Sequence, residues 1–117
     1  MIDTKNFTRE EFNCRCCGEN RMHQYVIETL QKVRDEFGHP IKVTSGWRCP
    51  ENNAESGGST NSSHMAGLAI DVEVKSSFHR YNFLLTAMKY FDRIGVAEDF
   101  IHIDMDPNKT SKLLWLY

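Results

Sequence analysis

The sequence has 117 residues, of which 40% are hydrophobic and 26% are charged, and a formal net charge of −2 at pH 7. This length and composition predict one soluble globular domain, residues 1–117, and exclude a disordered chain. The charge gives no basic excess for nucleic acid, and no apolar run is long enough to span a bilayer. The polar start "MIDTKNFTREEF" lacks the features of a signal peptide. We therefore expect a monomer, made in the cytoplasm, that binds no nucleic acid and spans no membrane.

The first half of the chain predicts a helical turn, one long helix and one strand. The segment "TREE" at 8–11 fits a capping box, which indicates the start of a helical turn. Apolar residues recur at helical spacing over 22–37 until Gly38 ends the pattern, so we expect an amphipathic helix. The segment "IKVTSG" at 41–46 is typical of a strand that runs into a turn. Residues 50–63 predict a long loop, and such loops in compact domains are usually functional.

The middle of the chain predicts a second strand followed by a second helix. Residues 68–74, "LAIDVEV", alternate between an apolar face and a face that carries Asp71. Ser76 or Ser77 then supplies an N-cap for the helix. The predicted apolar stripe of this helix comprises Phe78, Tyr81, Leu84, Leu85, Met88 and Phe91.

The last third of the chain predicts three strands. The segments "RIGVA" at 93–97 and "FIHIDM" at 100–105 are expected to be joined by a tight turn, and "LLWLY" at 113–117 predicts a last strand. Helices and strands do not alternate regularly, and the late strands resemble hairpins. We therefore predict an α+β fold with an antiparallel sheet packed by two main helices.

The four cysteines are distributed unevenly. Cys14, Cys16 and Cys17 lie together in "CRCCG", whereas Cys49 is remote. This C-x-C-C cluster does not match the paired C-x-x-C knuckles of structural zinc sites. We expect reduced, partly buried thiols. The less favoured alternatives are a disulfide from Cys49 to the cluster or a second metal site.

One histidine and two strand residues form the candidate site for chemistry. His64 ends the long loop, and Asp71 and His102 each point away from the apolar face of their strand. If these strands are neighbours in one sheet, the side chains meet on its polar side, and Gly67 between them lets the loop turn back. Two imidazoles and one carboxylate are a suitable ligand set for Zn²⁺. Three protein ligands leave the fourth position open, as in catalytic sites.

A general base would accept a proton from the attacking water in such a site. Asp99 is the candidate, because the turn before His102 can bring it over the site, and Glu98 is its competitor. Asp104 is an alternative to Asp71 as a ligand, although it lies very near His102 in the sequence. Each of these residues also has an ordinary structural interpretation, as a half-buried histidine, a cap or a turn residue.

The combined pattern resembles a known family. The segment "SSHMAGLAID" is similar to the S-x-H-x-x-G-x-A-x-D motif of the D-alanyl-D-alanine carboxypeptidase family of zinc metallopeptidases, which includes phage L-alanyl-D-glutamate endolysins. "DFIHID" resembles its second signature, in which an acidic base precedes the last zinc histidine by three residues. "TSGWRCPENN" resembles the segment whose arginine contacts substrate. The resemblance extends from about Phe7 to the end and is greatest to small single-domain members from phages and prophages.

The resemblance implies a role for particular residues. The implied zinc ligands are His64, Asp71 and His102, and the implied base is Asp99. Arg48 would hold a substrate carboxylate or polarise the scissile carbonyl through its paired donors. Ser62 would hydrogen-bond the substrate.

The resemblance further implies a fold like that of hedgehog domains and D,D-peptidases, and a zinc-dependent peptidase. Its substrate would be the peptidoglycan stem peptide of the bacterial cell wall, cleaved by a D,D-carboxypeptidase or an L-Ala-D-Glu endopeptidase, and the resemblance implies a phage or prophage origin. The dipeptidase branch typically has Glu as base and Trp just before the last histidine, where this chain has Asp99 and Ile101. That difference disfavours dipeptidase activity. The alternative is a non-catalytic, zinc-stabilised binding module, a use of this fold that the hedgehog signalling domain illustrates.

Overall fold

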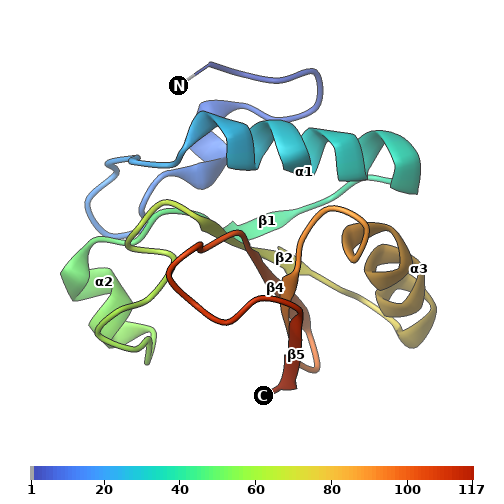
Figure 1. Ribbon diagram of the computed structural model, residues 1–117. Helices are drawn as coiled ribbons and strands as arrows, with labels where there is room; N and C mark the ends of the chain where they lie inside the picture. The colour runs from blue at the N-terminus through green and yellow to red at the C-terminus, as the bar shows by residue number, and fades with distance from the viewer. Residues whose placement is uncertain (1) are drawn as a thin grey trace.

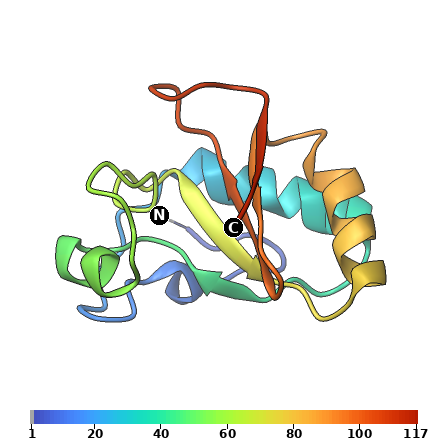
Figure 2. The ribbon, with the colours of Figure 1, turned by 90° about the horizontal axis from the view of Figure 1, so that it is seen from below.

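A five-stranded mixed sheet forms the centre of the protein. The structure, a computed structural model, describes residues 2–117. In chain order the elements are η1 (Arg9–Phe12), α1 (Gln24–Phe37), β1 (Val43–Ser45), α2 (Pro50–Glu55), β2 (Ala69–Glu73), α3 (Ser77–Ala87), β3 (Arg93–Val96), β4 (Phe100–Asp104) and β5 (Leu113–Leu116). Figures 1 and 2 show α1 lying across the sheet with α3 beside it, and α2 at the opposite end of the molecule from α3. The predicted α+β class is confirmed.

The strand order explains how distant segments meet. The order is β1-β2-β4-β3-β5, and the first four strands are antiparallel to their neighbours. In the central pair, Asp71 of β2 lies directly opposite His102 of β4. Ile70 and Ile103 form the adjacent pair and are fully buried in the core. Because side chains alternate along each strand, the core lies on one side of the sheet and the Asp71–His102 pair on the other.

The last strand departs from the prediction of an antiparallel sheet. β5 pairs with β3 in parallel, with Leu113 beside Arg93 and Trp115 beside Gly95. The reason is the length of residues 105–112, which carry the chain back to the beginning of β3 instead of turning tightly after β4. The side chain of Arg93 holds this return segment by donating to the backbone carbonyl of Thr110.

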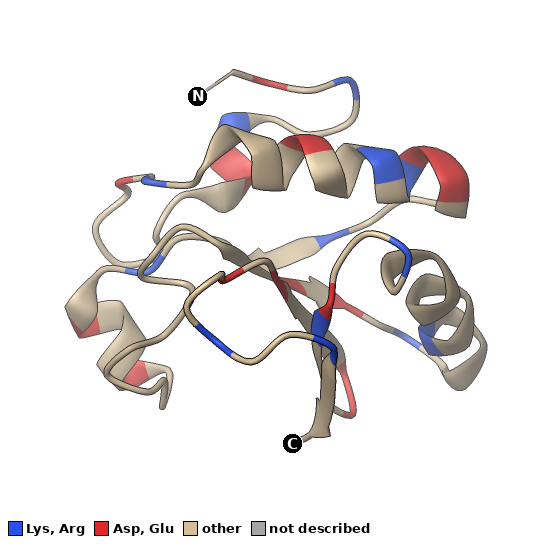
Figure 3. Ribbon diagram, viewed as in Figure 1, with Lys and Arg blue, Asp and Glu red and all other residues tan. Residues whose placement is uncertain are grey.

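The first helices form largely where the sequence predicts them. The capping box at Thr8 is present and begins η1. α1 ends at Gly38, whose left-handed φ of 79° suits a glycine, and the Gly38 amide donates to the carbonyl of Arg34. The buried face of α1 consists of Val26, Ile27, Leu30 and Val33. Figure 3 shows acidic and basic residues interspersed along this helix, as expected for a helix with one solvated face.

The predicted apolar stripe of α3 is wrong for most of its residues. Phe78, Tyr81, Leu85 and Met88 are 57–78% exposed. The helix instead buries Phe83, Thr86 and Ala87, and only Leu84 and Phe91 of the predicted stripe pack against the core. Apolar residues surround this helix on several sides, so helical spacing alone allows two alternative stripes. The predicted N-cap is confirmed at Ser76, whose hydroxyl accepts from the amide of His79 at 3.0 Å.

The predicted loop at 50–63 contains a short helix that the sequence analysis did not anticipate. α2 has a proline at its first position, and the Cys49 side chain accepts from the amide of Asn52 at its N-terminus. The remaining residues of the segment are irregular and lead into the His64 turn. Within residues 2–117, none of the helices combines the length and the apolar character needed to cross a membrane.

Candidate metal centre

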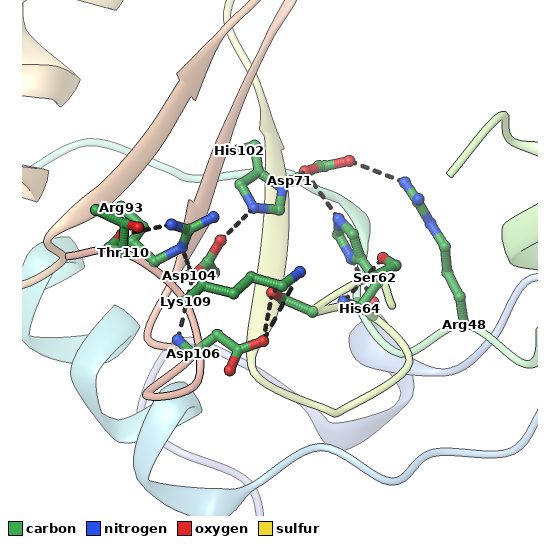
Figure 4. Close-up of polar contacts among 12 residues, drawn as sticks. Arg48, Ser62, His64, Asp71, Arg93, His102, Asp104, Asp106, Lys109 and Thr110 are labelled. Atoms are coloured by element: carbon green, nitrogen blue, oxygen red, sulfur yellow. Dashed lines mark hydrogen bonds and ion pairs between the residues drawn. The ribbon is translucent and has the colours of Figure 1, made fainter. Parts of the chain in front are cut away.

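His64, Asp71 and His102 meet at one point on the polar side of the sheet. Asp71 Oδ1 lies 3.1 Å from Nε2 of His64 and 3.0 Å from Nδ1 of His102. One ligand atom from each residue lies within 4.8 Å of the others, and all three side chains are buried. Figure 4 shows the two imidazoles approaching the same carboxylate. The structure therefore brings together the three residues predicted as zinc ligands.

A tight turn places His64 beside the sheet. The amide of Met65 donates to the carbonyl of Ser62, and the amide of Gly67 donates to that of His64. Gly67 has a φ of +73°, and a Cβ atom there would lie 2.1 Å from the carbonyl oxygen of Arg21. Only glycine fits both the left-handed conformation and this close approach. The glycine of the sequence motif thus allows the turn to pack against the segment before α1.

The hydrogen bonds of the two histidines leave the nitrogens that face Asp71 free to bind a metal. Nδ1 of His64 lies 2.8 Å from the carbonyl oxygen of Gly46, which can only accept, so this nitrogen carries the proton. Nε2 of His102 lies 2.7 Å from the Asp104 carboxylate, which accepts in the same way. Each ring is fixed by an acceptor on its far side, as in histidines that bind zinc. The chemistry and orientation of these donors fit a zinc ion.

Asp104 is a positioning residue for His102. Its second oxygen, Oδ1, accepts from Nε of Arg93 at 2.8 Å and from the amide of Asp106 at 3.1 Å. The carboxylate therefore lies on the far side of His102 from Asp71, and it is not part of the converging group. The sequence analysis considered Asp104 only as an alternative ligand and predicted neither this pairing nor a role for Arg93. The available signal was the spacing of the pair, because residues two apart in a strand, such as His102 and Asp104, lie on the same face.

The charges of the site are arranged for a cation. Burial by itself would raise the pKa of Asp71, but hydrogen bonds from the protonated forms of His102 and His64 outweigh it and hold the pKa well below its usual range, and a bound cation would take the place of those two protons. Burial would likewise raise the pKa of Asp104, but the hydrogen bond with His102 outweighs this effect, and the pKa is lowered. Burial would lower the pKa of His102, but hydrogen bonds to Asp104 and Asp71 raise it above its ordinary value. Both carboxylates are thus ionised at neutral pH and supply negative charge for a divalent ion.

A cavity of about 320 Å³ opens beside the ligands. Arg48 lines it and donates from Nη2 to the free oxygen of Asp71 at 3.1 Å. Ser62 also lines it, and its hydroxyl accepts from the amide of His64 at 3.2 Å. Lys109 and Trp115, which sequence reasoning did not single out, complete the wall, with the Trp115 ring centroid 5.4 Å from that of His102. The structure thus brings the predicted Arg48 and Ser62 to the same cavity as the ligands.

Asp99 and Glu98 lie elsewhere. Both are exposed in the turn between β3 and β4, and neither belongs to the residues that line the cavity. Backbone contacts hold this turn, since the carbonyl of Asp99 accepts from the amide of Val74 and that of Glu98 accepts from the Arg80 guanidinium. Phe100, the residue after Asp99, does line the cavity. The structure therefore places Asp99 next to the cavity wall but does not bring its carboxylate to the ligands.

Replacing Asp104 with asparagine will weaken zinc binding. The variant loses the negative acceptor that orients His102, and loss of such a partner typically costs about 10–100-fold in metal affinity. Competition against a chelator of known affinity measures the change. Asp106→Asn is the control, because Asp106 is also buried but accepts from Ser63 and touches no ligand. Equal zinc affinity in the two variants would contradict the positioning role.

These features together define a class of protein. Two imidazoles and one carboxylate beside an open cavity are the arrangement of a mononuclear zinc hydrolase. Sequence comparison identifies the family: the model of the Peptidase M15 family matches residues 5–104, and the chain belongs to that family. A search of curated proteins finds no match. Family and donor set agree on a zinc-dependent peptidase.

Proposed function

We propose that the protein hydrolyses the short stem peptides of bacterial peptidoglycan, as a D,D-carboxypeptidase or an L-Ala-D-Glu endopeptidase. The observation that carries this proposal is the cavity, whose lining includes the candidate zinc ligands and the cationic side chains of Arg48 and Lys109. Stem peptides contain free carboxylates that such cations would bind. Their action would place the protein at the cell wall. The sequence resemblance to small phage and prophage enzymes supports a phage or prophage origin, and a site built within one chain suits a monomer.

Zinc held by His64, Asp71 and His102 would act as a Lewis acid and lower the pKa of water to about 7. The protein's own residues would position the substrate around it. Arg48 is fixed by Asp71 and by the hydroxyl of Ser45, which accepts from its Nε at 3.0 Å. This leaves its remaining donors to hold a substrate carboxylate or the scissile carbonyl.

The other wall of the cavity would bind the peptide and limit access of water. Nζ of Lys109 donates to the hydroxyl of Ser63 at 3.0 Å and lies 3.8 Å from a carboxylate oxygen of Asp106, and these contacts hold the ammonium group at the wall. Trp115 of β5 and Tyr117, which follows that strand, line the cavity on the His102 side, and the ring centroids of Phe100 and Tyr117 lie 5.0 Å apart. An apolar cover strengthens electrostatic interactions inside a site, because it excludes water. Asp99 is the proposed general base, and Ser62 a proposed substrate contact.

The position of Asp99 favours one alternative function. Among the described residues 2–117, the carboxylates that line the cavity are Asp71 and Asp104, and both are engaged with the histidines. A site that binds zinc without a base would be a non-catalytic, zinc-stabilised binding module. That module would bind the same peptides but release no product.

Digestion of purified peptidoglycan distinguishes these functions. The zinc-loaded protein is incubated with peptidoglycan, with and without a chelator, and the fragments are identified by mass spectrometry. Release of terminal D-alanine identifies a D,D-carboxypeptidase, and new amino termini at D-glutamate identify an L-Ala-D-Glu endopeptidase. Both products should disappear with the chelator. Retention of zinc with no cleavage of either bond would contradict the proposal and favour the binding module.

A further inference from the structure

Three cysteine thiols converge at a second place in the protein. One sulfur from each of Cys14, Cys17 and Cys49 lies within 4.8 Å of the others, although 32 positions separate Cys49 from Cys17 in the sequence. Cys14 and Cys49 are buried, Cys17 is exposed, and all are free thiols. The residues that line the peptidase cavity do not include them. The cluster therefore has no part in the chemistry described above.

The backbone of residues 14–19 folds as a tight turn that carries Cys14 and Cys17. The amide of Cys14 donates to the carbonyl of Glu19 at 2.7 Å, and the amide of Gly18 donates to the carbonyl of Cys14 at 3.0 Å. Gly18 has a φ of +76°, which suits the left-handed position of such a turn. Within "CRCC", the outer pair Cys14 and Cys17 has two intervening residues, the spacing of a zinc knuckle. The C-x-C-C cluster thus contains one C-x-x-C pair, contrary to the expectation from the sequence.

Backbone amides point at two of the sulfurs. The amide of Cys49 donates to Sγ of Cys14 at 3.4 Å, and the amide of Asn52 donates to Sγ of Cys49 at 3.4 Å. Hydrogen bonds to a charged group favour its charged form, and although burial opposes this effect, backbone amides outweigh burial and lower the pKa of Cys14 to about 7. The Asn52 amide acts in the same direction on Cys49, but burial and the neighbouring Cys14 sulfur raise the pKa of Cys49 to about 12, so a cation is needed for both to be thiolates. Neighbouring thiolates repel each other unless a cation lies between them. Thiolate sulfur selects zinc over hard ions such as calcium or magnesium.

We propose that Cys14, Cys17 and Cys49 bind a second zinc ion, separate from the peptidase centre, which holds the two segments together and takes water as its fourth ligand. Cys16 lies exposed in the same turn but outside the converging group. The site would join the N-terminal segment to the residues just before α2. This connection is close to the peptidase centre, because Cys49 follows Arg48 directly in the sequence.

Residues 46–49, which lead up to Cys49, also support the first metal centre. The amide of Trp47 donates to the carbonyl of Phe12 at 2.9 Å, and the Trp47 indole donates to the carbonyl of Met65 at 2.9 Å. A Cβ atom on Gly46 would lie 2.6 Å from the backbone of Phe12, so the two segments are in close contact. The carbonyl of Gly46 in turn orients His64. Zinc at the cysteines would hold this contact in place and stabilise the folded protein.

Metal content of the full-length protein tests the proposal. After purification under reducing, oxygen-free conditions, mass spectrometry of metals should find about two zinc ions per chain. Cys14→Ser and Cys49→Ser should each lose one, and His102→Ala should lose the other. Cys16→Ser is the matched control within the same turn and should retain both ions, because the three converging thiols remain.

Cobalt substitution gives a readout that needs neither activity nor a fully stable variant. Cobalt bound to thiolates shows intense sulfur-to-metal charge-transfer bands, which histidine and carboxylate ligands do not give. We expect these bands in the wild-type protein and in His102→Ala, and their loss in Cys17→Ser, where the exposed position tolerates the change. A chelator should also lower the melting temperature of His102→Ala.

Two results would overturn the proposal. One is a single zinc ion per chain in the wild-type protein without charge-transfer bands on cobalt substitution. The other is a disulfide between Cys49 and the cluster in protein isolated without oxygen and without added reductant. Because these measurements do not depend on hydrolysis, they separate the cysteine site from the proposed peptidase function.

Discussion

Replacing His102 with alanine will remove one zinc ion per chain and abolish the proposed hydrolysis of peptidoglycan. His102 supplies one of the three converging ligand atoms, and its ring lies between Asp71 and Asp104. Loss of a residue that only orients a metal ligand lowers activity by up to about 100-fold. We expect the rate of hydrolysis to fall by more than this, because His102 is itself a ligand. Metal analysis and the rate of fragment release measure the two effects. Chelation of the wild-type protein should reproduce the loss of activity, and added zinc should restore it.

The control for this variant is His39→Ala, which makes the same change at an exposed histidine. His39 contacts the ring of Phe37 at the end of α1, far along the chain from the candidate ligands. The His39→Ala variant should retain the wild-type zinc content and the wild-type rate of hydrolysis. A His102→Ala protein that lacks the zinc ion but still cleaves peptidoglycan would show that hydrolysis does not need this centre.

The proximity of Asp71 and His102 could be predicted because it depends on alternation along single strands. The patterns "LAIDVEV" and "FIHIDM" assign each side chain to a sheet face, and only the adjacency of β2 and β4 had to be assumed. The position of His64 was predictable from the motif, since Gly67 marks the turn that returns it to the sheet. Local sequence therefore contained most of the information about the three candidate ligands.

The surroundings of the ligands depend on register between strands, which a single sequence does not reveal. Arg93 reaches Asp104 because β3 and β4 pair these two residues directly. Trp115 reaches His102 because β5 returns in parallel beside β3, with Trp115 next to Gly95. A Cβ atom at Gly95 would lie 2.5 Å from the Trp115 indole, so this glycine makes room for the ring. Neither contact follows from the pattern of one segment.

The buried side of α3 could not be predicted for a related reason. Its exposed apolar residues, such as Phe78 and Leu85, follow helical spacing as well as the buried Phe83 and Ala87 do. The choice between the two sides depends on where α1 lies, because α3 packs against α1 beside the sheet (Figure 1). Tertiary packing thus decided what periodicity left open.

Replacing Asp99 with asparagine will lower kcat while zinc stays bound. A positioned general base contributes about 10²–10⁴-fold to the rate, and the variant keeps the size and shape of the side chain but cannot accept a proton in the same way. Metal analysis should show unchanged zinc, because Asp99 is not among the converging ligands. The limb of the pH–rate profile that reports the free base should also disappear.

Glu98→Gln is the matched control, since Glu98 is exposed in the same turn and undergoes the same loss of charge. The turn is held through backbone carbonyls, so neither substitution removes a contact that fixes it. For Asp99 to act, its carboxylate must enter the cavity past Phe100, and substrate binding must stabilise that conformation. A large loss in Glu98→Gln with no change in Asp99→Asn would assign the base to Glu98. Full activity in both variants would show that the reaction takes its base from outside this turn.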